Sequence, residues 1–216
     1  SQRLESRLGV PSVQTAIAEL ENKSAILTFG ANLAEEAPIT YLRIRKAWFK
    51  NSAKVVAAFC QAAEADSFAF AVLHYNPGKE AVLAEGLRKL VSGAGSVEET
   101  AKETGVCAKE LKKAVEALSS ENTAWLTTTS LQAVSASAAE SLAAAAKEKG
   151  AKFSCLTTES SEQAASELGI LPDTLPGGAA ASQPGLNALE ILKAAKEGKI
   201  KTLWLVGCDP LADFPN

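Results

Sequence analysis

Short apolar segments alternate with longer amphipathic ones along most of the chain, which is the pattern of an α/β protein. Most apolar segments have few polar interruptions, as expected for strands that are buried on both faces of a parallel sheet. Helices must then cover the two faces. The pattern predicts strands at residues 25–29, 54–59, 123–128, 153–156 and 201–206.

One amphipathic segment begins at Pro38, which suits the first turn of a helix because proline lacks a backbone N–H. Tyr41, Ile44 and Trp48 recur at helical spacing with Leu42 beside them, so we expect an apolar face. Cations fill the other side and the C-terminal half, where they suit the helix macrodipole: Arg43, Arg45, Lys46 and Lys50. The helix should connect its flanking strands in a right-handed βαβ unit.

Further helices are predicted over 11–20, 79–92, a short segment after 96, 108–119, 136–149, 160–169 and 187–198. Ser96 and Asn187 each precede a glutamate by three residues, which is the pattern of a helix N-cap. Gly150 follows an alanine-rich segment and marks its end. Residues 169–185 are rich in proline and glycine and are expected to form a long loop, of the kind that is often functional in compact domains.

One motif occurs twice, once near each end of the chain. Each copy has an apolar segment, a glycine, then an amide or acid at offset 2, an acid at offset 6 and a proline at offset 8. The two copies are Gly30, Asn32, Glu36 and Pro38, and Gly207, Asp209, Asp213 and Pro215. Ligands of open parallel sheets bind at the carboxyl ends of strands, so both copies are candidate nucleotide-binding loops.

Local structure alone also explains the motif. Glycine permits a sharp turn, an Asx turn can form at the second position, and proline can begin a helix. With a ligand, the free backbone N–H groups at the helix start would bind an anion, and Asn32 could bond a ribose or base edge. Asp209 and Asp213 would repel phosphate in the second copy. The matched offsets are therefore better evidence for the ancestry of the two copies than for present ligand binding.

Composition excludes several other functions. The net charge of −3 argues against a nucleic-acid partner held by phosphate neutralisation, and no apolar run reaches the length that crosses a bilayer. The four cysteines, at 60, 107, 155 and 208, lie far apart, so we expect reduced and mostly buried thiols and no metal site. His74 precedes a turn signal and is expected at the surface, while Asp173 and Thr174 are expected either to cap the long loop or to touch a ligand.

Three segments carry a family resemblance: residues 29–38 together with 42–47, residues 167–178, and residues 202–210. They resemble the molybdopterin oxidoreductase family, and within it most closely the branch that contains the large G-type subunits of the NADH:quinone oxidoreductases of respiratory complex I. The segments extend over nearly the whole chain. The resemblance implies an α/β fold with Rossmann-like parallel sheets flanked by helices, of the formate dehydrogenase and DMSO reductase type (domains 1–3), present here in part.

The resemblance also implies a function. In molybdenum-containing members, two guanine-dinucleotide pterins lie across the lobes, and Gly30, Asn32, Glu36, Gly207 and Asp209 fall on the loops that hold them. In the complex I branch the metal cofactor is thought to be lost, and electrons pass through Fe–S clusters in a preceding region. The chain is therefore expected to be a cofactor-free scaffold beside other peripheral-arm subunits, in the cytoplasm at the inner face of the membrane, with no catalytic or metal-binding residue of its own.

Two alternatives remain open. The chain could belong to an active molybdopterin guanine dinucleotide enzyme of the formate dehydrogenase or nitrate reductase type, with its metal ligand and clusters encoded elsewhere. It could also be an unrelated nucleotide-binding module. The start without methionine and the end near Pro215, which should begin a helix, predict a fragment of a longer protein. We expect a first lobe segment with a helical extension at 1–120 and a second at 121–216.

Overall fold

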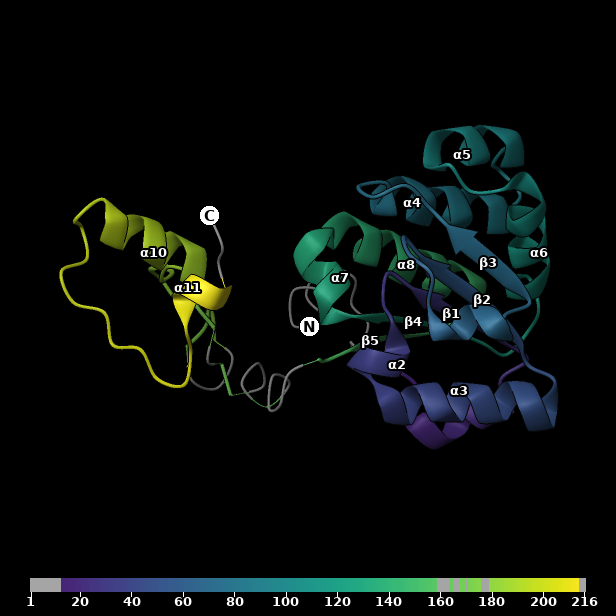
Figure 1. Cartoon of the computed structure of the whole chain (residues 1–216), viewed down its shortest axis with the longest axis horizontal. Helices are drawn as coiled ribbons and strands as arrows, with labels where there is room; N and C mark the ends of the chain where they lie inside the picture. The colour runs from purple at the N-terminus through teal and green to yellow at the C-terminus, as the bar shows by residue number, and fades with distance from the viewer. Residues whose placement is uncertain (1–12, 159–163, 165–167, 170, 176–178, 214–216) are drawn as a thin grey trace. The chain divides into compact units, whose positions relative to one another are not determined.

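The computed structural model describes residues 13–158, 164, 168–169, 171–175 and 179–213. The chain divides into two compact units, Ser1–Gln163 and Ala164–Asn216, each of which is described by itself (Figure 1). The expected helix from 160 to 169 and the helix expected at Pro215 lie largely or wholly outside the described residues.

A five-stranded parallel sheet forms the centre of the first unit, in the order β3-β2-β1-β4-β5. The strands are β1 Ala25–Phe29, β2 Lys54–Phe59, β3 Ala71–His74, β4 Thr123–Thr128 and β5 Lys152–Leu156. Four of them confirm sequence predictions. The short strand β3 was not predicted, because its four residues offer little pattern before the turn at Pro77 and Gly78.

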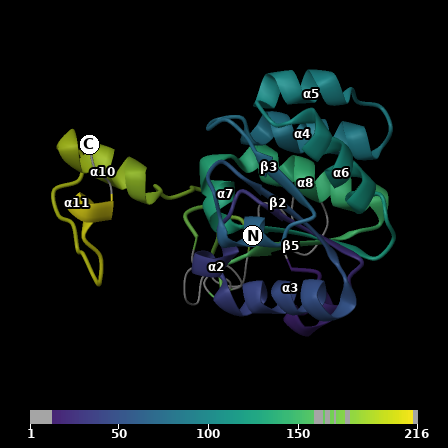
Figure 2. The ribbon, with the colours of Figure 1, turned by 45° about the vertical axis from the view of Figure 1, so that its right-hand side comes forward.

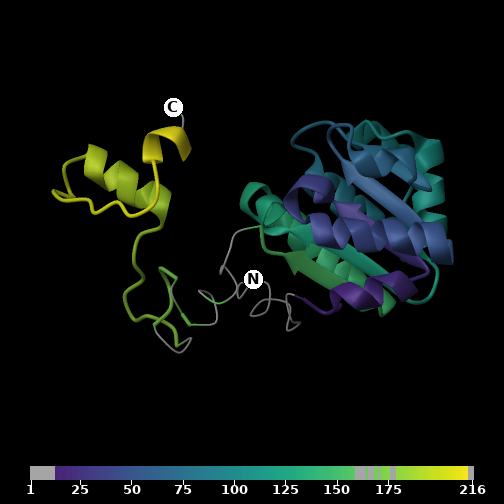
Figure 3. The same ribbon diagram turned by 60° about the horizontal axis from the view of Figure 1, so that its bottom comes forward.

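Helices cover both faces of this sheet, as its apolar strands require (Figure 2). On one face lie η1 Ile17–Asn22 and α3 Pro38–Asn51, which Figure 3 brings forward. The other face is covered by α4 Glu80–Val91, α6 Ala108–Leu118 and α8 Ala136–Lys149, with α5 Val97–Thr104 packed outside them. The short elements are α2 Leu33–Glu36, η2 Glu64–Ser67 and α7 Thr129–Val134.

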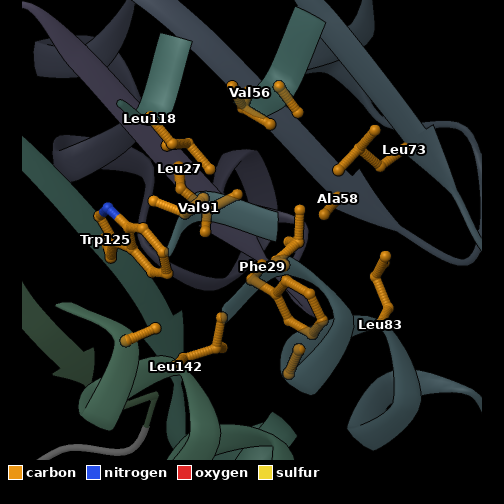
Figure 4. Close-up of a cluster of buried hydrophobic side chains, with 14 of the residues drawn as sticks. Leu27, Phe29, Val56, Ala58, Leu73, Leu83, Val91, Leu118, Trp125 and Leu142 are labelled. Atoms are coloured by element: carbon orange, nitrogen blue, oxygen red, sulfur yellow. The ribbon is translucent and has the colours of Figure 1, made fainter. Parts of the chain in front are cut away.

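Successive strand residues point into apolar cores on opposite faces of the sheet, which explains why the strands are apolar throughout. Leu27 and Phe29 pack with Trp125 under α4, α6 and α8, and Figure 4 shows this cluster. The intervening Ile26 packs on the other face with Ile44 of α3. Strands β4 and β5, which the sequence assigned to the segment 121–216, thus share one sheet with β1. The division of the chain at residue 120 stays a prediction.

The helix predictions hold with two corrections in the first unit. Residues 13–16 are not helical, since Val13 pairs as an antiparallel bridge with Ser154, and only the 3-10 helix η1 follows. In α3, Ile44 is buried as expected, but Leu42 is mostly exposed because it lies on the side of the helix opposite the core. The Ser96 cap is confirmed, with its hydroxyl accepting the Glu99 N–H.

The second unit contains α10 Ala188–Lys196 and α11 Pro210–Asp213. Asn187 and Glu190 form the predicted reciprocal capping box of α10. The strand predicted over 201–206 is wrong: the segment joins no sheet, and the side chain of Trp204 is 91% exposed. An apolar segment becomes a strand only where another strand supplies hydrogen-bond partners, and the described part of this unit contains none.

Candidate functional site

The strand order reverses between β1 and β4, because β2 and β3 extend the sheet on one side and β4 and β5 on the other. Ligands of open α/β sheets bind at the carboxyl end of such a point. A cavity of 250 Å³ lies at this end of the sheet. It is lined by Gly30, Glu36, Phe59, Cys60, Tyr75, Glu80, Ser130, Leu131 and Val134.

Gly30 directly follows β1 and has a left-handed backbone conformation, with φ of 68°, and its N–H donates to the carbonyl of Ala58 at 2.8 Å. A Cβ at this position would lie 2.6 Å from Cδ1 of Leu131 in α7. Both the dihedral angle and the close approach therefore require glycine. Leu131 is buried and occupies the space directly beside the turn that the sequence identified as a candidate binding loop.

Glu36 binds two parts of the site together. One carboxylate oxygen accepts the backbone N–H of Asn32 at 3.0 Å, and the other accepts the buried hydroxyl of Thr128 at 2.8 Å. Thr127, beside it, donates its hydroxyl to the carbonyl of Phe29 at 2.9 Å. Glu36 thus brings to this loop the negative charge that a bound anion would otherwise supply.

Asn32 forms hydrogen bonds in this loop through its backbone N–H and carbonyl groups. It precedes α2 without capping that helix by its side chain, so the Asx turn expected there is not formed. Its carbonyl accepts the N–H groups of Glu35 and Glu36. The Asn32 N–H, which could have bound a ligand, is bonded to the carboxylate of Glu36.

The second copy of the motif has the same local form in the other unit. Gly207 has φ of 63°, and α11 begins three residues after it, as α2 begins three residues after Gly30. The carboxylate of Asp209 accepts the N–H of Leu211 at 3.1 Å, which is the Asx turn that the first copy lacks. Because Gly207 and Asp209 are exposed and follow no strand, the matched offsets correspond to a matched turn and not to a second sheet edge.

Several cavity residues were not identified as site residues from the sequence. Tyr75 follows the unpredicted β3, and its ring stacks on Phe29 with centroids 5.7 Å apart. Burial raises the pKa of the Tyr75 phenol, and the negative charge of Glu80 and then Cys60 adds to the effect. Glu80 is buried and accepts the N–H of Gly78 at 3.2 Å. Tyr75 and Glu80 both come after β3, so the sequence could assign them to this end of the sheet only if β3 had been predicted.

The other candidates are not among the residues that line the cavity. His74 is partly exposed, as expected, and its Nε2 lies 2.8 Å from Oδ2 of Asp66, a partner that the sequence could not reveal. The hydroxyl of Thr174 donates to the carbonyl of Gly169 at 3.0 Å, and the backbone carbonyl of Asp173 accepts the N–H of Ala181, which agrees with a loop-capping role.

The cysteines differ from expectation. Cys155 is buried and Cys60 is half-buried, but Cys107 and Cys208 are exposed, so the thiols are not mostly buried. All four are free. Across the described residues, no group of three or more His, Cys, Asp or Glu side chains is arranged to hold a metal ion. Nor does any described helix have the length and apolarity needed to span a membrane.

The residues around the cavity beside Gly30 do not fit a pterin dinucleotide. The cavity is smaller than the roughly 300–1,000 Å³ of typical ligand pockets, and its two carboxylates would repel a pyrophosphate. The Asn32 N–H is bonded to Glu36, and Leu131 covers the glycine turn. The residues at this edge therefore suit a closed structural contact better than a pterin site.

Comparison with known proteins shows the family to which the chain belongs. The chain is 26% identical to the NADPH-Fe(3+) oxidoreductase subunit alpha of Geobacter sulfurreducens over 259 residues, covering 99% of this chain and 31% of the relative. It is 30% identical to the NADH-quinone oxidoreductase G subunit of Streptomyces coelicolor over 236 residues, covering all of this chain and 26% of the relative. It thus spans less than a third of the length of either curated relative.

Among solved structures, the acetylene hydratase of Pelobacter acetylenicus is similar over 63% of this chain and 24% of its own, with a TM-score of 0.46 and 14% identity. The family profile described as molybdopterin oxidoreductase matches residues 6–216. That match includes both copies of the glycine motif and nearly all of the sequence, so the chain belongs to the molybdopterin oxidoreductase family.

Proposed function

We propose that the chain is a scaffold segment of the large peripheral-arm subunit of an NADH:quinone oxidoreductase. It supports electron transfer from NADH to quinone through Fe–S clusters carried elsewhere in the parent protein, and it binds no cofactor of its own. The similarity over the whole chain to the Streptomyces protein, which is named as an NADH-quinone oxidoreductase component, supports this assignment. The parent would lie in the cytoplasm, against the inner face of the membrane, through its partner subunits.

The observation that carries the proposal is the double hydrogen bonding of Glu36. A loop that holds a dinucleotide needs free N–H groups and a net attraction for phosphate. Here the carboxylate of Glu36 takes the Asn32 N–H and also bonds Thr128, so the loop and the end of β4 are joined by the protein's own side chains. Together with Leu131 packed on Gly30, this arrangement favours a structural role for the former binding edge.

The alternative is a segment of an active molybdopterin enzyme. The family itself motivates it, and so does the relative named NADPH-Fe(3+) oxidoreductase subunit alpha, which matches almost the whole chain. Under this alternative, Gly30, Asn32, Glu36, Gly207 and Asp209 would contact the cofactor. The carboxylates of Glu36 and Glu80 at the described edge count against it.

Metal and pterin analysis of the full-length parent protein, purified from its own cells without chelators, separates the two. We expect iron and labile sulfide, with molybdenum and tungsten far below one equivalent and no fluorescent pterin after acid oxidation. Stoichiometric molybdenum or tungsten with a released pterin would establish the alternative. Iron-free protein would contradict the electron-transfer setting altogether.

A further inference from the structure

The outer side of α3 is apolar, which is unusual for a helix whose inner side already packs on a sheet. Ile39, Leu42 and Phe49 follow one another at offsets of 3 and 7 residues, so they form one stripe along the helix. Their exposed fractions are 61%, 54% and 75%. The buried apolar residues of α3, Ile44 and Ala47, lie on the opposite side of the helix, where they pack with strand residues of the sheet. A helix that is apolar on both sides normally has a second partner.

Aromatic packing holds the C-terminal end of this stripe in place. The ring of Trp48 lies 6.1 Å from Phe49 and 5.0 Å from Phe68, measured between centroids. Two hollows, of 490 and 450 Å³, flank Trp48 and Phe49. Preordered aromatic side chains beside hollows that can receive apolar side chains are the usual centre of a protein interface.

The charged residues of α3 itself are all of one sign. The helix carries four cations and no carboxylate between Pro38 and Asn51, although the whole chain has a net charge of −3. Glu21 pairs with Arg43 and Lys46, but neither Arg45 nor Lys50 forms an ion pair with any described residue. These two exposed cations lie on either side of the stripe, since helical geometry separates them by about 140°. A partner of complementary charge would therefore be acidic.

We propose that the outer side of α3 is a docking surface for an acidic amphipathic segment of a partner protein. Apolar side chains of that segment fill the hollows beside Trp48 and Phe49, and its carboxylates pair with Arg45 and Lys50. A cationic apolar helix also suits a lipid surface, but the hollows on both sides of Phe49 fit discrete side chains better than a flat bilayer. The surface lies on the opposite face of the sheet from α4 and α8 and goes beyond the proposed scaffold role.

A photo-crosslinking experiment tests the surface in the full-length protein in its own cells. Phe49 is replaced by p-benzoylphenylalanine, which its exposure should permit, and thermal unfolding verifies the fold. We expect, after irradiation, one protein adduct that maps to a segment with apolar residues at helical spacing flanked by Asp or Glu. The charge-reversed pair R45E/K50E should lower the adduct yield about tenfold. The matched pair K109E/K149E, on exposed lysines of α6 and α8, should leave it unchanged.

The other outcomes overturn the proposal. Adducts to lipid would identify a membrane surface, and adducts to a second copy of this protein would identify a self-association interface. An adduct to a segment without carboxylates, an equal effect of the two charge-reversed pairs, or no adduct in a folded protein would each exclude an acidic partner. Metal and pterin content is measured separately, so a failure here leaves the scaffold proposal to its own test.

Discussion

The carboxylate of Glu36 accepts the hydroxyl of Thr128 at 2.8 Å across 92 residues of sequence. This bond joins the loop after β1 to the end of β4, at the point where the strand order reverses. The same carboxylate bonds the N–H of Asn32. One acidic residue thus joins two segments at the edge where open α/β sheets bind their ligands, so its removal should affect the stability of this edge.

Thr128→Val should lower the free energy of unfolding by about 1–3 kcal/mol, because it removes a hydrogen bond to a charged group and leaves a partly buried carboxylate without that partner. Glu36→Gln keeps the shape and one acceptor, so we expect a smaller loss than for Glu36→Ala. Urea unfolding of the four proteins in an E36A/T128V cycle measures the coupling. Strictly additive effects would show that the bond does not stabilise the fold.

Gly30→Ala should be more destabilising than Gly150→Ala, although both glycines have nearly the same φ, 68° and 67°. At Gly150 no atom lies within 4 Å of an added Cβ, so only the left-handed conformation costs about 1–2 kcal/mol. At Gly30 the added carbon also meets Leu131 at 2.6 Å, which should cost a further 1–3 kcal/mol or so.

Denaturant unfolding of both glycine variants checks the difference, and a G30A/L131A double variant checks its cause. The two changes should be less than additive, because shortening Leu131 makes room for the new methyl group. Equal losses for Gly30→Ala and Gly150→Ala would mean that Leu131 moves aside without cost.

How much of this structure can be predicted from the sequence depends on the kind of interaction that forms each element. Apolar continuity identified β1, β2, β4 and β5 because burial on both faces of a sheet constrains every residue of a strand. The same reasoning failed for 201–206, where composition suits a strand but no neighbouring strand is present in the described unit. It missed β3 because four residues are too few to show a period.

The site was predictable only in part. Gly30 and Glu36 line the cavity at the carboxyl end of the sheet, where the motif placed them, since glycine and acid spacing is local information. That they bind a ligand stays a prediction. The motif could not show that Glu36 would bond Thr128, or that Leu131 would pack on Gly30, because these contacts bring together residues about 100 positions apart. Tyr75 and Glu80 also line the cavity, but they follow β3, and that strand was not predicted.

Tyr75 should make stability fall more steeply at alkaline pH. The ordinary phenol pKa of 10.0 is raised in the folded protein by burial and by the charges of Glu80 and Cys60. Above pH 10 the unfolded chain therefore loses the Tyr75 proton first, the folded state binds more protons, and the free energy of unfolding decreases as pH rises. Below pH 10 the phenol is protonated in both states and has no such effect.

The check compares wild type with Tyr75→Phe by urea unfolding between pH 8 and about 11. The loss of stability above pH 10 should be smaller in the variant, which has no phenol to ionise at this position. Ultraviolet titration of the folded proteins should show that the tyrosinate signal removed by the substitution is one that forms above pH 10. A parallel decline of the two proteins would show that the Tyr75 environment does not favour the neutral phenol.

Two buried threonines should respond oppositely to the same substitution. The hydroxyl of Thr15 has no hydrogen-bond partner among the described residues, whereas that of Thr104 donates to the Thr100 carbonyl at 2.6 Å and accepts the Val106 N–H. Thr15→Val replaces an unsatisfied polar group by a methyl of similar size, so stability should be unchanged or rise by up to about 1 kcal/mol. Thr104→Val breaks both bonds and leaves the Val106 N–H unpaired, which should cost about 1–3 kcal/mol. Urea unfolding of the two variants under one condition measures the contrast. A comparable loss in both would indicate that the Thr15 hydroxyl is satisfied in solution, for instance by an ordered water.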